Sequence, residues 1–349
     1  MFRTLVIAIG ALALAGAARA QAVKSFKDWS VVCDNLRTCS AFGYTEEGAD
    51  TDAFIRIVRP GGPAGTPRVT LRADAEDGDD GKAPLTWRIS VDGQVPPSLA
   101  AVAARAGESE RRAELTPAQS AALIGALRSG AALTILGGKA PIAISLAGSS
   151  AALLWMDDRQ GRVGTTTALV ARGPKPASAV PPAPAPPMVR AAPPAPQTGL
   201  PTKLPALIRN DRRLKDCDDP EAAKFDPIVA RLAPGEFLWA APCSAGAYNL
   251  LSVLFVADEA GRGARELIPP DAEAPNPDAD DELMNIDYDA KTRTLSAFAK
   301  ARGLGDCGAA TRWVWDGKAF ALLDEQVMPD CRGVTADDWP SLYHAVRAP

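Results

Sequence analysis

The sequence predicts an α+β protein that is rich in β-structure and consists of two small domains joined by a proline-rich linker. Three observations lead to this expectation. Residues 174–201 contain eleven prolines in 28 positions. The stretches on either side, 21–172 and 202–349, are nearly equal in length, and each is large enough for one small core. Apolar and polar residues alternate in several short runs, as half-buried strands require.

The linker is assigned to residues 173–201. A segment so rich in proline is extended and semi-rigid, and it would span up to ~85 Å if it were wholly polyproline II at about 3.1 Å per residue. Two rigid domains joined by such a tether are suited to bind a partner at two separate sites.

The first twenty residues have the three parts of a secretory signal peptide. Arg3 supplies the positive charge, residues 5–17 are apolar, and residues 18–20 (ARA) form a small-x-small cleavage site. Cleavage there would leave a mature chain that begins at Gln21. We therefore expect residues 1–20 to be removed and the mature protein to be a soluble protein of the periplasm, with no insertion into the membrane.

The charge of the mature chain argues against nucleic acid as a partner. Without Arg3 and Arg19, 36 basic residues (38 − 2) face 42 acidic ones, a net charge of −6. The basic residues occur singly or in pairs and form no long Lys/Arg tract, so neither nucleic acid nor an anionic membrane surface is favoured as a partner.

The N-terminal domain, residues 21–172, is expected to be a sheet with one or two helices. In KDWSVVC, the residues Trp29, Val31 and Cys33 alternate on one face of a strand. Further strand-like runs are 53–58, 68–73, 85–91 and 141–148.

Two helices are expected in this domain. Thr116, a following proline and Gln119 are typical of a helix N-terminus, and Gly130 marks the end of that helix. The second helix is expected over residues 149–162.

The C-terminal domain, residues 202–349, is expected to be an antiparallel meander. Its strand-like runs are 284–289, 294–301, 311–316 and 318–327. Asp316-Gly317 indicates a two-residue hairpin turn. Trp313 and Trp315 share one face of their strand and are expected in the core.

Six cysteines in an exported chain indicate three disulfides. Sequence alone allows fifteen pairings. Only two cysteines precede the linker, so Cys33 is expected to pair with Cys39. Among the remaining four, neighbouring cysteines are expected to pair, which gives Cys217–Cys243 and Cys307–Cys331.

Zinc is the alternative use of these cysteines. The chain has no C-x-x-C, and its single histidine, His344, lies among the last six residues. We therefore expect no metal site.

Several motifs resemble one known family. They are SFKDWSVVCDNLRTC (25–39), AALLWMDDRQGRVGT (151–165), APCSAGAYN (241–249), YDAKTRTLSAFAKARGLGDCG (288–308), WVWDG (313–317), CRG (331–333) and DWP (338–340). Together they closely resemble the six-cysteine exported proteins of proteobacteria catalogued as domain of unknown function 1176. The W-x-V-x-C opening and the S-L-x-G-x-x-x-A-L step also resemble the family named for invasion-associated locus B. Neither resemblance implies an activity, a cofactor or catalytic residues.

The residues themselves give little support to an enzyme. A serine-protease triad would need His344, at the end of the chain, and no G-x-S-x-G or H-E-x-x-H is present. We therefore assign no catalytic residue and no cofactor.

Residues 303–308, GLGDCG, match the G-x-G-x-x-G pattern of dinucleotide-binding loops. Such a loop must open a helix, whereas the residues that follow alternate like a strand. The glycines are therefore expected to form a tight crossing between two strands beside Cys307, where Arg302 and Asp306 are candidates for contact with a partner.

A second candidate site lies at the end of the expected helix 149–162. Five residues there combine an aromatic ring, both signs of charge and an amide, a mixture that suits a polar ligand or peptide: Trp155, Asp157, Arg159, Gln160 and Arg162. The alternative is a solvated helix end with a surface ion pair between Asp158 and Arg162. A groove shared by residues 151–165 and 302–308 would unite the two candidate sites.

The functional prediction is a periplasmic binding or accessory module without enzymatic activity. Its expected partner is an envelope protein or a peptidoglycan fragment. The alternative is a hydrolase that acts on envelope polysaccharide through a pair of carboxylates.

Overall fold

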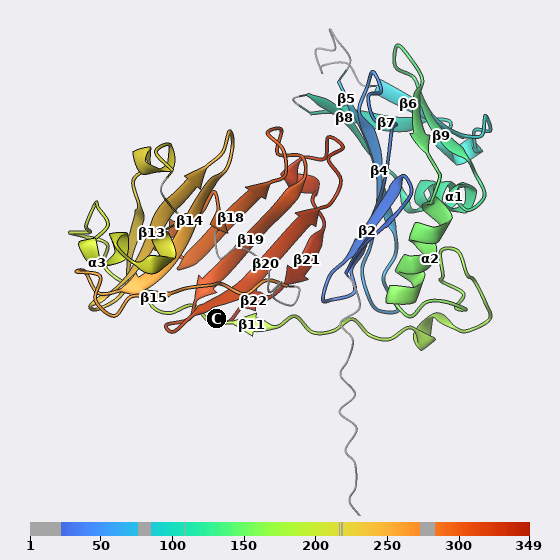
Figure 1. The fold of residues 1–349 in the computed structure, drawn as a ribbon. Coiled ribbons are helices and arrows are strands. Elements are labelled where there is room, and N and C mark those ends of the chain that lie inside the picture. Colours follow the sequence, from blue (N-terminus) through green and yellow to red (C-terminus); the bar gives the residue numbers. More distant parts are fainter. Residues whose placement is uncertain (1–21, 76–84, 108, 216, 218, 273–282) are drawn as a thin grey trace, which may run out of the picture.

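The computed structural model describes residues 22–75, 85–107, 109–215, 217, 219–272 and 283–349 (Figure 1). The predicted signal peptide lies outside these residues. We call residues 22–172 the N-terminal part and residues 202–349 the C-terminal part. Strands make up most of the regular structure in both parts, which confirms the β-rich fold class.

The strands of the N-terminal part are β1 (Val23–Phe26), β2 (Trp29–Cys33), β3 (Cys39–Tyr44), β4 (Ala53–Arg59), β5 (Arg68–Asp74), β6 (Leu85–Val91), β7 (Val102–Ala106), β8 (Glu110–Glu114), β9 (Ala132–Leu136) and β10 (Ile142–Ser145). Within the described residues they form one ten-stranded antiparallel sheet, in the order β1-β2-β3-β4-β5-β8-β7-β6-β9-β10. The sheet curls, because an isolated bridge between Thr45 and Ile144 brings β10 back to the end of β3.

The helices of this part are η1 (Pro97–Leu99), α1 (Pro117–Leu127) and α2 (Ser149–Arg159). As expected, α1 begins with a capping box between Thr116 and Gln119. The second helix ends three residues before the expected position, since Gly161 takes a positive φ of 67° that breaks the helical path.

Both α-helices cover one face of the curled sheet (Figure 1). Alternate residues of β4, Ala53, Ile55 and Ile57, belong to the core on that face, together with Leu123 of α1 and Met156 of α2. The intervening residues of β4 point to the opposite face, which packs against the C-terminal part as described below.

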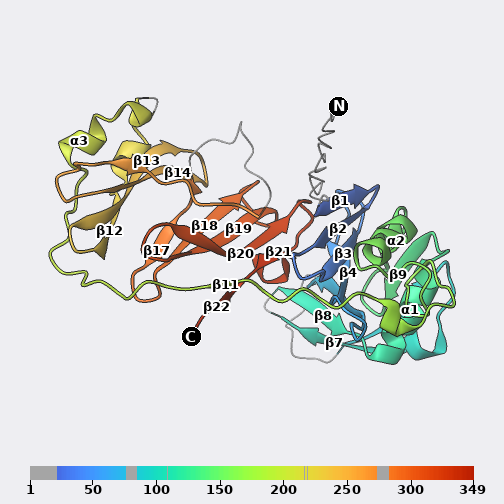
Figure 2. The same cartoon turned by 90° about the horizontal axis from the view of Figure 1, so that it is seen from below.

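The proline-rich segment is extended, but it lies along the protein (Figure 2). It contains η2 (Ala177–Ala179) and β11 (Met188–Val189), and β11 pairs in parallel with β22 (Val346–Arg347) at the C-terminus. The N–H of Ala192 also donates to the carbonyl of Trp315 at 2.8 Å. These contacts attach the segment to the C-terminal part.

The remaining strands are β12 (Ile228–Ala233), β13 (Glu236–Ala245), β14 (Leu250–Ala257), β15 (Arg265–Glu266), β16 (Leu283–Met284), β17 (Asp287–Asp289), β18 (Thr294–Lys300), β19 (Gly308–Trp315), β20 (Phe320–Met328) and β21 (Ser341–His344). In the described part of the chain they form two five-stranded sheets: β12-β13-β14-β15, with β16 beside β14, and the meander β17-β18-β19-β20-β21. Short helical segments accompany them: α3 (Ala206–Arg209), η3 (Arg212–Leu214), η4 (Ala222–Lys224) and η5 (Ala336–Asp338).

The meander confirms the expected antiparallel arrangement, with one correction to a turn. Trp315 pairs with Phe320, and the N–H of Asp316 donates to the carbonyl of Ala319 at 3.0 Å. The turn is therefore centred on Gly317-Lys318, one residue later than expected. The Asp316 carboxylate accounts for the shift, because it accepts the N–H groups of Lys318 and Ala319 at 2.7 and 2.9 Å.

The two sheets of the C-terminal part share an apolar core that includes Leu238, Leu254, Trp313, Trp315 and Phe320. Both tryptophans are buried, as expected. The other face of the β12–β16 sheet is covered by the segment that follows the linker, whose Ile208 packs with the Trp239 and Phe255 group.

All six cysteines lie in the described part of the chain and form three disulfides: Cys33–Cys39, Cys217–Cys243 and Cys307–Cys331. These are the expected pairs. Each bond lies within one part, so none of them links the N-terminal part to the C-terminal part.

The two parts pack directly on each other. Phe42, Tyr44 and Phe54 of the curled sheet share a buried cluster with Met328, Val334 and Trp339. At its margin, the buried Asp338 carboxylate forms ion pairs with Arg56, at 2.9 Å, and with Arg112. The linker therefore connects two parts that already touch.

Candidate functional site

The helix-end residues of the first candidate site are mostly internal. The Asp157 side chain is fully buried, and its oxygens accept the N–H groups of Leu169 and Val170 at 2.8 and 2.9 Å. Arg59 lies 3.5 Å from the same carboxylate. Burial raises the pKa of Asp157 above its ordinary value, although the two N–H groups and the nearby arginines oppose the shift.

Gln160 and Arg162 join the end of α2 to the loop after β4. The Gln160 amide donates to the carbonyls of Arg37 and Arg59 at 2.9 and 2.8 Å. Its oxygen accepts from Nε of Arg162 at 2.9 Å, and Arg162 also donates to Gly62. The surface ion pair between Asp158 and Arg162 is therefore wrong, because the Arg162 guanidinium is buried and has internal partners.

Trp155 and Arg159 keep exposed surface in this group. The guanidinium of Arg159 lies over the Trp155 ring, 5.6 Å from its centroid. The other members, Asp157, Gln160 and Arg162, are occupied by the protein itself. Contact of a ligand with Trp155 and Arg159 stays a prediction.

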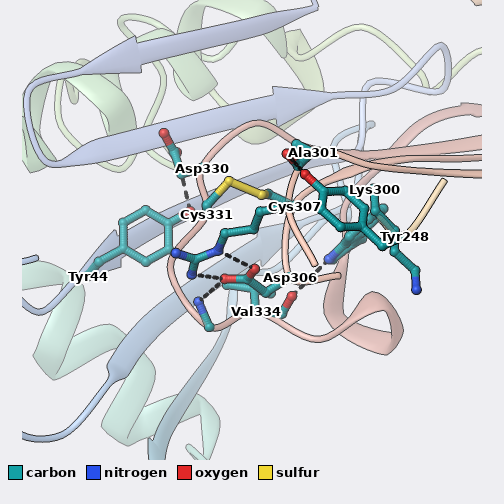
Figure 3. The surroundings of a disulfide bond; sticks show 12 residues. Tyr44, Tyr248, Lys300, Ala301, Asp306, Cys307, Asp330, Cys331 and Val334 are labelled. Atoms are coloured by element: carbon teal, nitrogen blue, oxygen red, sulfur yellow. Dashed lines mark hydrogen bonds and ion pairs between the residues drawn. A yellow bond between two sulfur atoms is a disulfide. The ribbon is translucent and has the colours of Figure 1, made fainter. Parts of the chain in front are cut away.

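The second candidate site lies beside the Cys307–Cys331 disulfide (Figure 3). Asp306 is only 5% exposed, and it accepts Nε of Arg302 at 2.7 Å and the N–H of Gly333 at 2.7 Å. Burial favours a higher pKa for Asp306, but the bonds from Arg302 and Gly333 outweigh it and the pKa is lowered. Arg302 and Asp306 thus form a fixed ion pair.

The GLGDCG motif is the turn between β18 and β19, as expected, with Lys300 paired to Gly308. Gly308 has a φ of 132°, and a Cβ atom there would lie 2.0 Å from the carbonyl oxygen of Ala299. The glycine is needed for the close approach of two backbones.

This turn carries an exposed apolar surface. Leu304 is 80% exposed and Tyr248, from the neighbouring hairpin, is 42% exposed. The Tyr248 hydroxyl donates to the carbonyl of Ala301 at 3.3 Å (Figure 3). We call the surface formed by Tyr248, Arg302 and Leu304 the Leu304 corner.

Four of the hollows are lined by described residues alone, and none of these four has walls from both candidate sites. The groove that would have joined residues 151–165 with residues 302–308 is therefore not among them. One hollow, of about 510 Å³, is lined by β10 and by residues 45–51. Another, of about 530 Å³, lies beside residues 258–262.

The other two hollows adjoin on the outer face of the β17–β21 sheet, opposite the tryptophan core. Their volumes are about 450 and 210 Å³, and both are lined by Ser296 and Arg312. We call this pair of hollows the sheet groove. Its walls are Asn285, Asp287, Asp289, Thr292, Thr294, Ser296, Ala297, Phe298, Ala310, Thr311, Arg312, Leu323, Asp324, Gln326 and Arg347.

Hydrogen bonds order the side chains of the sheet groove. Arg312 forms a two-point ion pair with Asp324, with N–O distances of 2.9 and 2.7 Å. Asp289 accepts the Thr292 hydroxyl at 2.7 Å, and this bond, together with backbone N–H groups, lowers its pKa. Arg347 donates to the carbonyl of Thr292 at 2.7 Å and to the Thr294 hydroxyl.

Sequence reasoning missed the sheet groove. Its residues come from successive strands of the meander and meet only through strand register, such as Ser296 opposite both Asp287 and Arg312. The available signal was the polar side of the run 294–301, in which Thr294 and Ser296 alternate with the core residue Leu295.

In the described part of the chain, no group of three or more His, Cys, Asp or Glu side chains is arranged to hold a metal ion. Likewise, no helix in the described ranges is long and apolar enough to cross a membrane.

The protein is rich in β-strands and has three disulfides, which is consistent with an exported protein. The chain belongs to the family described as "Protein of unknown function (DUF1176)", whose model matches residues 23–346. It is 32% identical over 358 aligned residues to the "Uncharacterized protein YpfG" of Escherichia coli (strain K12), with 93% of each chain covered. No solved structure matches the chain significantly.

Proposed function

We propose that the protein is a binding module of the bacterial cell envelope, without enzymatic activity, and that it binds a peptidoglycan fragment in the sheet groove. The observation that carries this proposal is the continuity of the two hollows through Ser296 and Arg312. Hydroxyl, amide and charged groups line them, and Phe298 adds an aromatic side chain at one end. Such walls suit a ligand rich in hydroxyl and amide groups.

The carboxyl groups give the alternative, a carboxylate-dependent hydrolase, less support. A general acid needs a raised pKa. Burial raises the pKa of Asp34, Asp74, Asp157 and Asp271, but none of these residues lines one of the four hollows. In the sheet groove, Asp289 instead has a lowered pKa and stays ionised.

The periplasm is the proposed location. Disulfides persist in oxidising compartments such as the periplasm, and the chain has three of them. The signal peptide predicted over residues 1–20 supports the same location.

The proposal is tested by calorimetric titration of the oxidised mature protein with purified muropeptides. Binding is expected, and Arg312→Gln should weaken it about fivefold or more, because this residue lines both hollows. The matched control is Arg209→Gln, an exposed arginine outside the groove.

Two results would contradict the proposal. Absence of binding at millimolar muropeptide would exclude the groove as the site. Chromatography that shows the muropeptide being cleaved would favour the hydrolase instead.

A second candidate, attachment to an envelope protein, is supported by the Leu304 corner. The 80% exposed Leu304 and the 42% exposed Tyr248 give this disulfide-held turn an apolar surface that a partner protein could cover. Pull-down from envelope extract should retain a partner with the wild-type protein and lose it with Leu304→Ser. A partner retained equally by both proteins, or by neither, would reject the corner as an attachment site.

A further inference from the structure

We propose that the larger hollow of the sheet groove selects a zwitterionic ligand, such as the end of a short peptide, by binding its ammonium group at Asp287 and its carboxylate at Arg347. This inference rests on the proposed function, since it takes the groove as the ligand site. It adds the chemical class of the group that is recognised.

The charged side chains of the sheet groove are only partly paired with one another. Arg312 and Asp324 neutralise each other through their two-point ion pair. Both hydrogen bonds of Arg347 go to neutral oxygens, the Thr292 carbonyl and the Thr294 hydroxyl. Among the described residues, Asp287 has no hydrogen bond or ion pair through its carboxylate. Arg347 therefore has no acidic side chain in direct contact, and Asp287 has no partner for its carboxylate.

The sheet groove as a whole carries more acidic than basic side chains. Asp289 is ionised and accepts the Thr292 hydroxyl and the N–H of Lys291, so its partners are neutral groups. With it, the groove holds three aspartates and two arginines. This excess of acid disfavours a ligand whose charged groups are all negative, such as a phosphate ester, because no ammonium group offsets the repulsion.

The spacing between Asp287 and Arg347 follows from the strand register. Asp289 pairs with Thr294 and Asp287 pairs with Ser296 across the β17–β18 ladder. Arg347 donates a hydrogen bond to the Thr294 hydroxyl, so its guanidinium lies beside the Asp289–Thr294 pair. Two residues along a strand correspond to roughly 7 Å.

That spacing decides the kind of zwitterion. In a single α-amino acid the ammonium and the carboxylate are attached to the same carbon, which is too close to reach both positions. A dipeptide, or a diamino acid at the end of a peptide, separates the two groups by several bonds. A hollow of about 450 Å³ has room for such a group.

Asp287 and Arg347 are both exposed, so each charge is expected to change affinity moderately, by about threefold to fivefold. Neither side chain belongs to a buried core. Replacement of either should therefore leave the fold intact, which thermal unfolding of the variants can verify.

The experiment is a calorimetric titration of the oxidised mature protein with three probes: a muramyl tripeptide that ends in diaminopimelate, the same peptide with its amine acetylated, and the same peptide with its carboxylates amidated. Wild type should bind the unmodified peptide about threefold to fivefold more tightly than either modified form. Asp287→Asn should remove the effect of acetylation, and Arg347→Gln should remove the effect of amidation. Glu259→Gln, an exposed residue of a different hollow, serves as the control.

The outcomes are distinguishable. Equal binding of all three probes by wild type would overturn the zwitterion inference while the proposed function stands. Persistence of the acetylation effect in Asp287→Asn would also overturn it. Absence of binding by every probe would instead remove the proposed function, and this inference with it.

Discussion

Asp157 illustrates how a charged residue at a helix end can serve the fold. Sequence reasoning weighed it as a ligand contact or as part of a solvated helix end. In the structure its carboxylate is buried and holds two backbone N–H groups of residues 169 and 170, beside Arg59. This arginine is only 3% exposed, and its burial lowers its pKa to about 10.

Asp157→Ala is expected to destabilise the protein by about 3 kcal/mol, because it leaves two backbone N–H donors buried without an acceptor and the buried Arg59 without its counter-charge. Urea unfolding of the oxidised protein measures the effect. Asp158→Ala, at the exposed neighbouring position, is the control and should stay within about 0.5 kcal/mol of wild type. Equal effects of the two substitutions would show that the internal bonds of Asp157 do not matter.

Among the secondary-structure elements, the β18–β19 hairpin depends on one glycine at the end of its turn. Gly308 begins β19 directly after the Cys307 disulfide. Its backbone approaches Ala299 so closely that no side chain fits between them. The glycine-rich motif is thereby explained by backbone geometry.

Gly308→Ala is expected to destabilise the protein by about 2 kcal/mol or more, since it combines a positive φ with a Cβ atom 2.0 Å from a carbonyl oxygen. Gly246→Ala is the matched control, because its nearest contact would be 3.7 Å away. Thermal or urea unfolding compares the two variants. A Gly308→Ala protein as stable as the control would contradict this account of the turn.

For the molecule as a whole, the contact between the two parts changes the role of the linker. Phe42 and Phe54 are buried against Val334 and Trp339, and Asp338 binds two arginines of the curled sheet. The parts are therefore expected to stay together when the linker is cut.

The measurement uses a protease site inserted between Pro184 and Ala185, in an exposed stretch of the linker. After cleavage the two parts should elute together in size-exclusion chromatography, and no disulfide can account for this, since none crosses between them. Asp338→Ala should promote separation, whereas Asp337→Ala, at an exposed neighbour, should not. Separate elution of the wild-type parts at tens of micromolar would contradict the interface.

Much of the fold could be predicted from local patterns. Alternation found the strands around Trp29, Ile55 and Trp313, and the Thr116 capping box found α1. Strands β1, β3, β7, β8 and β9 of the N-terminal part were missed, and so were β12–β15 and β21 of the C-terminal part. β8 reads ERRAE, which carries almost no apolar alternation, and its arginines make sense only through acidic partners elsewhere in the fold, such as Asp338 with Arg112.

The sequence by itself determined the β-rich class and the extended proline segment, because strand alternation and fixed proline φ are local properties. It predicted the three disulfides, but six cysteines allow fifteen pairings and the fold decided among them. Tertiary structure alone decided which polar residues became internal, as with Gln160 and Arg162, and which became a surface, as with the sheet groove. It also decided that the two parts touch. The physical reason is that burial and strand register depend on partners that lie far away in the sequence.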